Sequence, residues 1–225
     1  MEIIAELAPT LNKDLFLKHL EALRRYVEKV DIPEAPGGRP SAHSLAAGVL
    51  AKQAGLEPLV HIRLLDINMT AFKSLLGGAR LLDIKYVVLL QGDPPAEGRP
   101  VGEIATEEAV AVAKKMGFKT GALLSLRRDY KKRLEIGADF YLALHLREAE
   151  QLADLPPVVY PYVLVRTEKN FDLLERLGQT AVSPREALEL VRKLEGLAPG
   201  VVISAPRDFQ TLLKLLQEVK ARPLN

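Results

Sequence analysis

Short apolar runs alternate with longer amphipathic runs along the chain, and the alternation repeats about eight times. An apolar, β-branched run of strand length predicts a buried strand, whereas apolar residues at helical spacing predict a helix that packs one face on a sheet. Leu15, Phe16, Leu20 and Leu23 show the second pattern. We predict strands over Glu2–Leu7, Val27–Ile32, Pro58–Leu65, Tyr86–Leu90, Phe118–Ser125, Asp139–His145, Val158–Arg166 and Val201–Ala205.

Helices are predicted between and after these strands, and two of them carry end signals. Thr106, followed by two glutamates, predicts an N-cap with acids at the positive end of the helix, and Ser183 before Pro184 predicts a second N-cap. The predicted helices are Lys13–Glu28, Ser41–Ala54, Thr70–Leu82, Thr106–Met116, Asp129–Ile136, Arg147–Ala153, Lys169–Leu177, Pro184–Glu195 and Asp208–Ala221.

The order of the elements indicates the fold class. Strands joined by helices pair in parallel, because each crossover returns the chain to the same end of the sheet. Eight such units in 225 residues predict an α/β fold, a single (β/α)8 TIM barrel that spans residues 1–225 as one domain. A doubly wound open sheet is the alternative.

Composition narrows the class of partner. The 31 basic and 29 acidic residues leave a net charge of +2, so bulk charge favours a small-molecule ligand over nucleic acid or a membrane surface. The chain has no cysteine, and its four histidines lack the spacing of a metal site, which predicts neither disulfide nor metal. An acidic N-terminal segment and the lack of a membrane-length apolar run predict a cytoplasmic protein.

Charged residues cluster at the predicted strand ends, where TIM barrels carry their active sites. Acids prevail at the early ends and bases at the late ends, which suits a ligand with an anionic end and a centre that needs protons. For any single residue, a solvated loop position is the alternative. The early set is Glu6, Asp31, His61, Asp66 and Asp93, and the late set is Arg127, Arg128, His145, Arg166, Ser204 and Arg207.

Glu6 is an acid inside an otherwise apolar strand. A buried carboxylate has a raised pKa and can deliver a proton near neutral pH, and a salt bridge to a rim arginine is the structural alternative. His61 lies among apolar neighbours, where a hydrogen-bonded core histidine is the alternative to a ligand contact. Lys132 and Arg133 oppose the dipole of a predicted helix, which an anion, acids or solvent exposure would offset.

Ordered motifs along nearly the whole chain resemble the methylenetetrahydrofolate reductase family of flavin-containing TIM barrels. They are "IIAELAPT" in the first predicted strand, the histidine of "PLVHIRLLD" in the third and "LLQGDPP" after the fourth. The segments "YKKRLEIGADF" and "YPYVLVRT" follow in the order that the family shows.

The resemblance implies a flavin-dependent oxidoreductase that passes hydride from NAD(P)H through FAD, or FMN, to a C1-carrying folate or modified pterin. Glu6 would protonate the pterin amine, and Asp93 would lie near flavin and folate in the same mouth of the barrel. Gly92 would let the backbone approach the flat flavin ring. The implied cofactor-binding residues are Asp31, His61, Gln91, Gly92, Lys132 and Arg133, and the implied substrate-binding residues are His145 and Arg166.

The chain departs from the family pattern at several of these positions. Gln91 replaces the family's arginine, Asp31 replaces a threonine, and the strand-five loop is short, so FAD would be held weakly or together with a partner subunit. The alternative is a flavin-free pterin-binding protein, or a methyl-transfer or regulatory subunit. In it, Asp31, Asp66 and Asp93 would bind the donor edge of the pterin. A homo-oligomer is compatible with either function.

Overall fold

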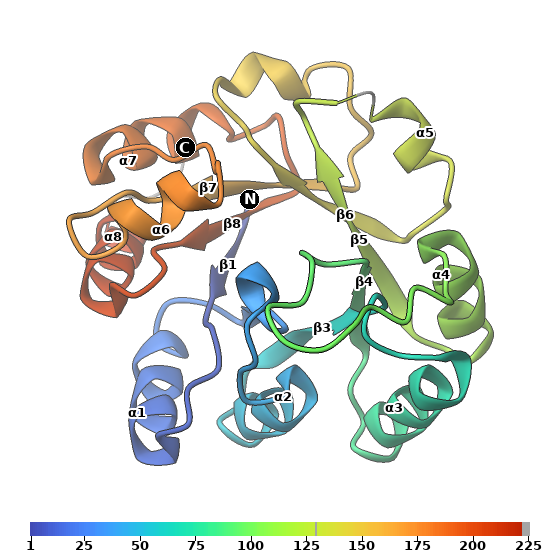
Figure 1. The fold of residues 1–225 in the computed structure, drawn as a ribbon. Helices are drawn as coiled ribbons and strands as arrows, with labels where there is room; N and C mark the ends of the chain where they lie inside the picture. Colours follow the sequence, from blue (N-terminus) through green and yellow to red (C-terminus); the bar gives the residue numbers. More distant parts are fainter. Residues whose placement is uncertain (129, 222–225) are drawn as a thin grey trace.

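Eight parallel strands close into one barrel in the computed structural model, which describes residues 1–128 and 130–221 (Figure 1). Each strand pairs with the next along the chain, and β8 pairs with β1. The predicted TIM barrel is therefore confirmed, and the open sheet is excluded. The strands are β1 (Glu2–Glu6), β2 (Lys29–Ile32), β3 (Glu57–Arg63), β4 (Tyr86–Leu90), β5 (Lys119–Ser125), β6 (Phe140–Leu144), β7 (Val159–Leu164) and β8 (Gly200–Ser204).

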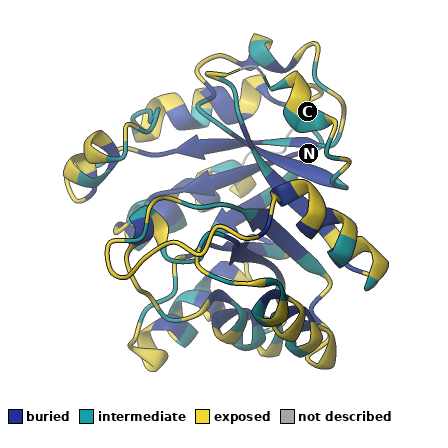
Figure 2. Ribbon diagram, turned by 45° about the vertical axis from the view of Figure 1, so that its right-hand side comes forward, coloured by how far each residue is buried: buried dark blue, intermediate teal, exposed yellow. Residues whose placement is uncertain are grey.

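Helices surround the barrel and bury their inner faces on it, as Figure 2 shows by the dark strands and the mixed colours of the helices. No helix in the described residues is long and apolar enough to cross a membrane. The helices are α1 (Lys13–Leu23), α2 (Ser44–Gln53), α3 (Met69–Leu81), α4 (Thr106–Lys115), α5 (Lys131–Leu134), α6 (Phe171–Arg176), α7 (Pro184–Lys193) and α8 (Phe209–Ala221), with 3-10 turns η1 (Pro36–Gly38) and η2 (Ala149–Leu152).

Most of the predicted helices are shorter in the structure, and the segments after β1, β5 and β6 are among those that differ. The first ends at Leu23 rather than Glu28, because the residues that follow turn and enter β2. After β5 only the four residues of α5 are helical, and the predicted start at Asp129 lies outside the described residues. After β6 the chain forms the 3-10 turn η2 instead of an α-helix.

The two predicted caps have different outcomes. Ser183 caps α7 as expected, and its hydroxyl accepts from the Glu186 N–H while Glu186 accepts from the Ser183 N–H. Thr106 is not a cap, because Ala105 precedes the helix and Thr106 is its first residue. The buried Thr106 hydroxyl lies instead 3.4 Å from Gln91 Nε2, behind the end of β4.

The side chains inside the barrel change from apolar to polar along its axis. Alternate strand residues point inward, and the middle of the barrel is filled by an apolar cluster that includes Ile4, Leu59, Val88, Leu142 and Val202. Two residues further along β1, β2, β3, β7 and β8, the inward positions are polar. This polar layer lies at the carboxyl ends of the strands, where a barrel carries its chemistry.

Candidate functional site

A connected set of polar side chains occupies the carboxyl end of the barrel. We call Glu6, Asp31, His61, Tyr162 and Ser204 the central polar cluster. His61 Nε2 lies 2.8 Å from Asp31 Oδ1, and the Tyr162 hydroxyl donates to Asp31 Oδ2. The Ser204 hydroxyl donates to Glu6 Oε1, and Glu6 also interacts with Tyr162. Five strands thus contribute to one network that links Glu6 to His61.

Burial and mutual charge set the protonation of this cluster. Burial, followed by the charge of the Asp31 carboxylate, raises the pKa of Glu6 from 4.5 to about 7, and the Ser204 hydrogen bond opposes the rise. Burial lowers the pKa of His61, but the charge and hydrogen bond of Asp31 outweigh it and raise that pKa above 6.5. Near neutral pH, Glu6 is therefore about half protonated, beside a histidine whose cationic form is stabilised by Asp31.

The prediction of a raised pKa at Glu6 is confirmed, and the predicted alternative of a salt bridge to a rim arginine is wrong. The partner of Glu6 is the Ser204 hydroxyl from β8, which pairs directly beside β1. Tyr162 does not supply a second anion, because burial and the charges of Asp31 and Glu6 raise its pKa well above 10.

Glu6 lines a cavity of about 390 Å³ between α1 and α8, which we call the Glu6 cavity. Most of its walls come from the segments that follow β1 and β8, which include Arg207 and Asp208, and α1 and α8 add a few mainly apolar side chains. His19 and Phe209 stack within the wall with ring centroids 3.7 Å apart. A cavity of this size and mixed lining fits a small ligand that presents a ring to the apolar wall and a polar edge to Glu6.

A second cavity, of about 350 Å³, opens over β2 to β7, and we call it the Arg63 cavity. His61 and Tyr162 of the central polar cluster line it, together with Arg63, Arg133 and Gln179. The central polar cluster therefore lies between the two cavities, with Glu6 facing one and His61 the other.

Asp93 does not share a mouth with Glu6, contrary to the prediction. Asp93 lines the Arg63 cavity, whereas Glu6 lines the Glu6 cavity. The exposed Asp93 carboxylate accepts from the Gly37 N–H at 3.0 Å, so it fastens the loop after β4 to η1, and these two segments lie side by side in Figure 1. The two strands that carry the acids are separated by β2 and β3, and the central polar cluster fills the space between.

The prediction that three aspartates bind the donor edge of a pterin also fails, because two of them are paired with other side chains. Asp31 is fully buried and both of its oxygens are hydrogen-bonded within the cluster. Asp66 pairs with Arg63, whose Nε and Nη2 reach its two oxygens at 2.6 and 3.2 Å. Glu6, by contrast, lines the Glu6 cavity and has no salt-bridge partner among the described residues.

The space over Gly92 does not fit a flavin ring. Gly92 has the left-handed φ of 87° that glycine tolerates, but the Arg63 guanidinium covers it, and a Cβ added there would lie 2.4 Å from Arg63 Nη1. Arg63 Nη2 also donates to the Asp93 carbonyl, which holds the guanidinium in place. Gln91 also lines this cavity, but its Nε2 is engaged by the Ile104 carbonyl at 2.8 Å. Gly92 and Gln91, both implied for FAD, are thus engaged by Arg63 and the Ile104 carbonyl.

The two residues of the predicted basic pair, Lys132 and Arg133, have different surroundings. Arg133 lines the Arg63 cavity and its Nε donates to the Leu123 carbonyl at 2.9 Å, whereas Lys132 is exposed and lines neither cavity. His145 and Arg166 also line neither cavity. Burial and three nearby arginines lower the pKa of His145, which favours its neutral form.

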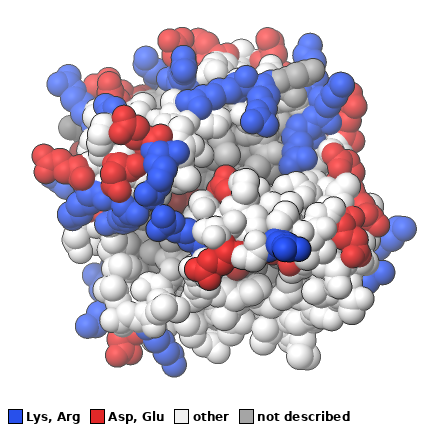
Figure 3. Space-filling view, in the orientation of Figure 1, with Lys and Arg blue, Asp and Glu red and all other residues white. Residues whose placement is uncertain are grey.

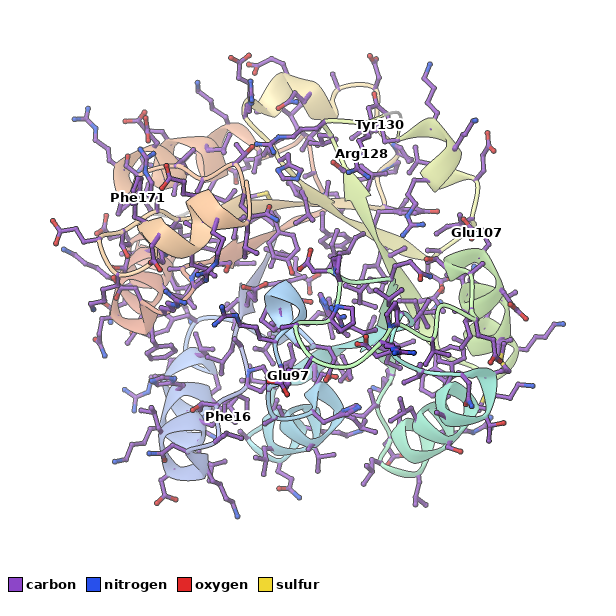
Figure 4. All side chains as sticks on the ribbon, in the orientation of Figure 1. Phe16, Glu97, Glu107, Arg128, Tyr130 and Phe171 are labelled. Atoms are coloured by element: carbon purple, nitrogen blue, oxygen red, sulfur yellow. The ribbon has the colours of Figure 1, made fainter. Side chains whose placement is uncertain are left out.

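The late half of the rim is basic, as predicted. Figure 3 shows a hollow in the face formed by the strand ends, with Lys and Arg side chains around the later elements and mostly uncharged atoms over α2 and α3. Figure 4 places Arg128 and Tyr130 beyond β5 and Glu97 on the opposite side, in the loop after β4. An anionic part of a ligand is attracted toward the β5 to β8 side.

Comparisons with known proteins agree on the architecture. No family model and no curated protein matches the chain. Its fold matches a Clostridium thermocellum protein that binds two copies of 5-methyl-5,6,7,8-tetrahydrofolic acid, at 9% identity and a TM-score of 0.71 over 98% of this chain and 95% of that one. The tryptophan synthase complex of Pyrococcus furiosus matches at 14% identity and 0.63 over 98% of each chain. The fold is shared.

Sequence identities this low show a shared fold and nothing more, so membership in the methylenetetrahydrofolate reductase family stays a prediction. Phosphoribosyl anthranilate isomerase of Thermococcus kodakaraensis, at 12% identity, a TM-score of 0.58 and coverage of 98% and 99%, shows that unlike chemistries share this barrel.

Several residues of the two cavities were not predicted as site residues, among them Arg63, Tyr162 and Gln179. Tyr162 had a detectable signal, because it stands two residues after Tyr160 on a strand whose alternate side chains point inward. Gln179 had none, since it lies in the loop between α6 and α7. Only closure of the barrel brings it to the Arg63 cavity.

Proposed function

We propose that this protein binds a reduced folate or a related pterin in the Glu6 cavity, and that Glu6 recognises the ring and exchanges a proton with it. The observation that carries the proposal is a carboxyl with a pKa of about 7 in the wall of a cavity of about 390 Å³. The tetrahydrofolate-binding protein with the same fold supports the choice of ligand.

The chemistry of Glu6 matches that of a reduced pterin. Such a ring carries N–H donors and basic amine nitrogens, and a carboxyl that is about half protonated at neutral pH can accept from the first and donate to the second. The Ser204 hydroxyl donates to Glu6 Oε1 and so helps to fix the carboxyl in the cavity wall. The stacked pair His19 and Phe209 offers an apolar wall for the ring.

The finer function, reduction of a C1-carrying folate by NAD(P)H through a flavin, remains a prediction. The contacts of Arg63 with Gly92 and of Gln91 with Ile104 argue against it, because they occupy groups that would meet the flavin. We therefore favour the flavin-free pterin-binding protein, including a methyl-transfer or regulatory subunit. A visible flavin band in the purified protein, or its appearance on addition of FAD or FMN, would reverse this preference.

Isothermal titration calorimetry with 5-methyltetrahydrofolate tests the proposal. We expect saturable binding near pH 7, and a heat that changes between buffers of different ionisation enthalpy because Glu6 changes protonation. Glu6→Gln keeps the shape but removes the acid, and it should weaken binding by about tenfold or more. The control is Glu168→Gln, which changes an exposed carboxyl outside both cavities. Equal affinity of the wild type and Glu6→Gln would refute the site.

A further inference from the structure

The Arg63 cavity contains a buried acceptor that no described residue satisfies. Gln179 lines the cavity, and its Oε1 is buried without a hydrogen-bond partner within residues 1–128 and 130–221. A buried amide oxygen left without a donor is costly, so such an atom in a cavity wall is a binding group for a ligand N–H.

The loop that carries Gln179 is held in place from across the mouth. Arg127 donates through Nη1 to the Gly178 carbonyl at 2.6 Å and through Nη2 to the Thr180 hydroxyl at 2.8 Å. Both neighbours of Gln179 are therefore tied to the loop after β5. The loop backbone on either side of Gln179 is therefore held before a ligand binds, which lowers the ordering cost of binding.

Arg133 supplies the complementary group. Its Nε donates to the Leu123 carbonyl, which fixes the guanidinium in the wall, and its Nη1 is 4.0 Å from Glu107, beyond hydrogen-bond distance. The terminal nitrogens can therefore bind an anionic oxygen. Arg63 is less available, because four of its five N–H donors already serve Asp66, Asp93 and Ala35.

The remaining walls set the size and polarity of the ligand. Leu90, Leu123, Leu144 and Leu177 give the cavity an apolar lining between these polar groups. A volume of about 350 Å³ admits a one- or two-ring compound and is small for a dinucleotide.

We propose that the Arg63 cavity is a second ligand site, separate from the Glu6 cavity, which binds a small heterocyclic carboxylate with a ring N–H on Gln179 and its carboxylate on Arg133. Because different residues form the two cavities, this site can exist whether or not a folate binds at Glu6. The two share the central polar cluster, with His61 and Tyr162 on the Arg63 side.

The test uses pterin-6-carboxylate as a fluorescent probe in a titration of the intact protein. Gln179→Leu removes the acceptor, and Arg133→Lys keeps the charge but removes the fork of the guanidinium. We expect each to weaken probe binding by about tenfold. Gln53→Leu, which changes an exposed glutamine at the end of α2, should bind the probe as the wild type does.

Thermal melts separate a binding role from a structural one. Gln179→Leu replaces an unsatisfied buried acceptor with an apolar group, so its Tm should equal or exceed that of the wild type while probe binding falls. Unchanged probe affinity in both Gln179→Leu and Arg133→Lys, or no probe binding by the wild type, would overturn this site. Failure of 5-methyltetrahydrofolate to bind would instead refute only the Glu6 proposal.

Discussion

The titration of Glu6 should make the stability of the protein fall as pH rises from 5 to 8. An unfolded glutamate has a pKa near 4.5, and the pKa in the folded protein is about 7. The folded state therefore binds more protons than the unfolded state within this window, and the free energy of unfolding decreases with increasing pH. Below 4.5 both states are protonated, so Glu6 imposes no penalty there.

The size of this change in stability follows from the pKa shift of Glu6. One pKa unit corresponds to about 1.4 kcal/mol, so the full shift from 4.5 to about 7 amounts to about 3 kcal/mol. Most of that change lies between pH 5 and 8. Because Glu6 is partly exposed at its cavity wall, solvent screening reduces the effect, and we expect about 2 kcal/mol.

Glu6→Gln removes this titration. Urea unfolding followed by far-ultraviolet circular dichroism, which suits a chain without tryptophan, should show the variant gaining about 2 kcal/mol on the wild type between pH 5 and pH 8. Glu168→Gln, on the exposed surface, should follow the wild type. The raised pKa of His61 also makes the protein less stable as pH rises, and because Glu6 contributes to that shift, Glu6→Gln should reduce this effect as well. Parallel pH profiles of wild type and Glu6→Gln would refute the reasoning.

Three further substitutions test the packing around the site and the helix ends. Tyr162→Phe removes the donor to Asp31 Oδ2 and leaves a buried carboxylate oxygen short of a partner, which should cost about 1–3 kcal/mol in urea unfolding. Gly92→Ala forces a side chain into φ 87° and against Arg63, and should cost about 1–3 kcal/mol by the same measurement. Ser183→Ala removes the capping box of α7 and should lower the Tm by roughly 2–4 °C, for a loss of about 1 kcal/mol.

Each of these expectations has a contradicting result. Wild-type stability in Tyr162→Phe would mean that Asp31 is satisfied without the phenol. Wild-type stability in Gly92→Ala would mean that Arg63 can leave the glycine, which would reopen the space for a flavin ring. For Ser183→Ala the control is Ser74→Ala, an exposed position within α3, and equal melting temperatures of the two variants would contradict the cap.

The sequence alone determined the elements and their order. Strand and helix periodicities arise from which side chains a local segment must bury, so they can be read within a window of a few residues. All eight strands and the barrel follow from that pattern, as does the Ser183 cap. The buried acid at Glu6 was predictable for the same reason, because one charge in an apolar strand is a local feature with a local electrostatic cost.

Only the tertiary structure decided which side chains meet. Tyr162 and Asp31 are 131 residues apart in the chain, and closure of the barrel brings them into contact. Closure likewise placed Arg63 over Gly92 and turned Asp93 toward η1, away from Glu6. A strand end specifies that a residue lies at the mouth, but its direction depends on partners from distant strands. The division into two cavities therefore could not be read from the spacing of residues along the chain.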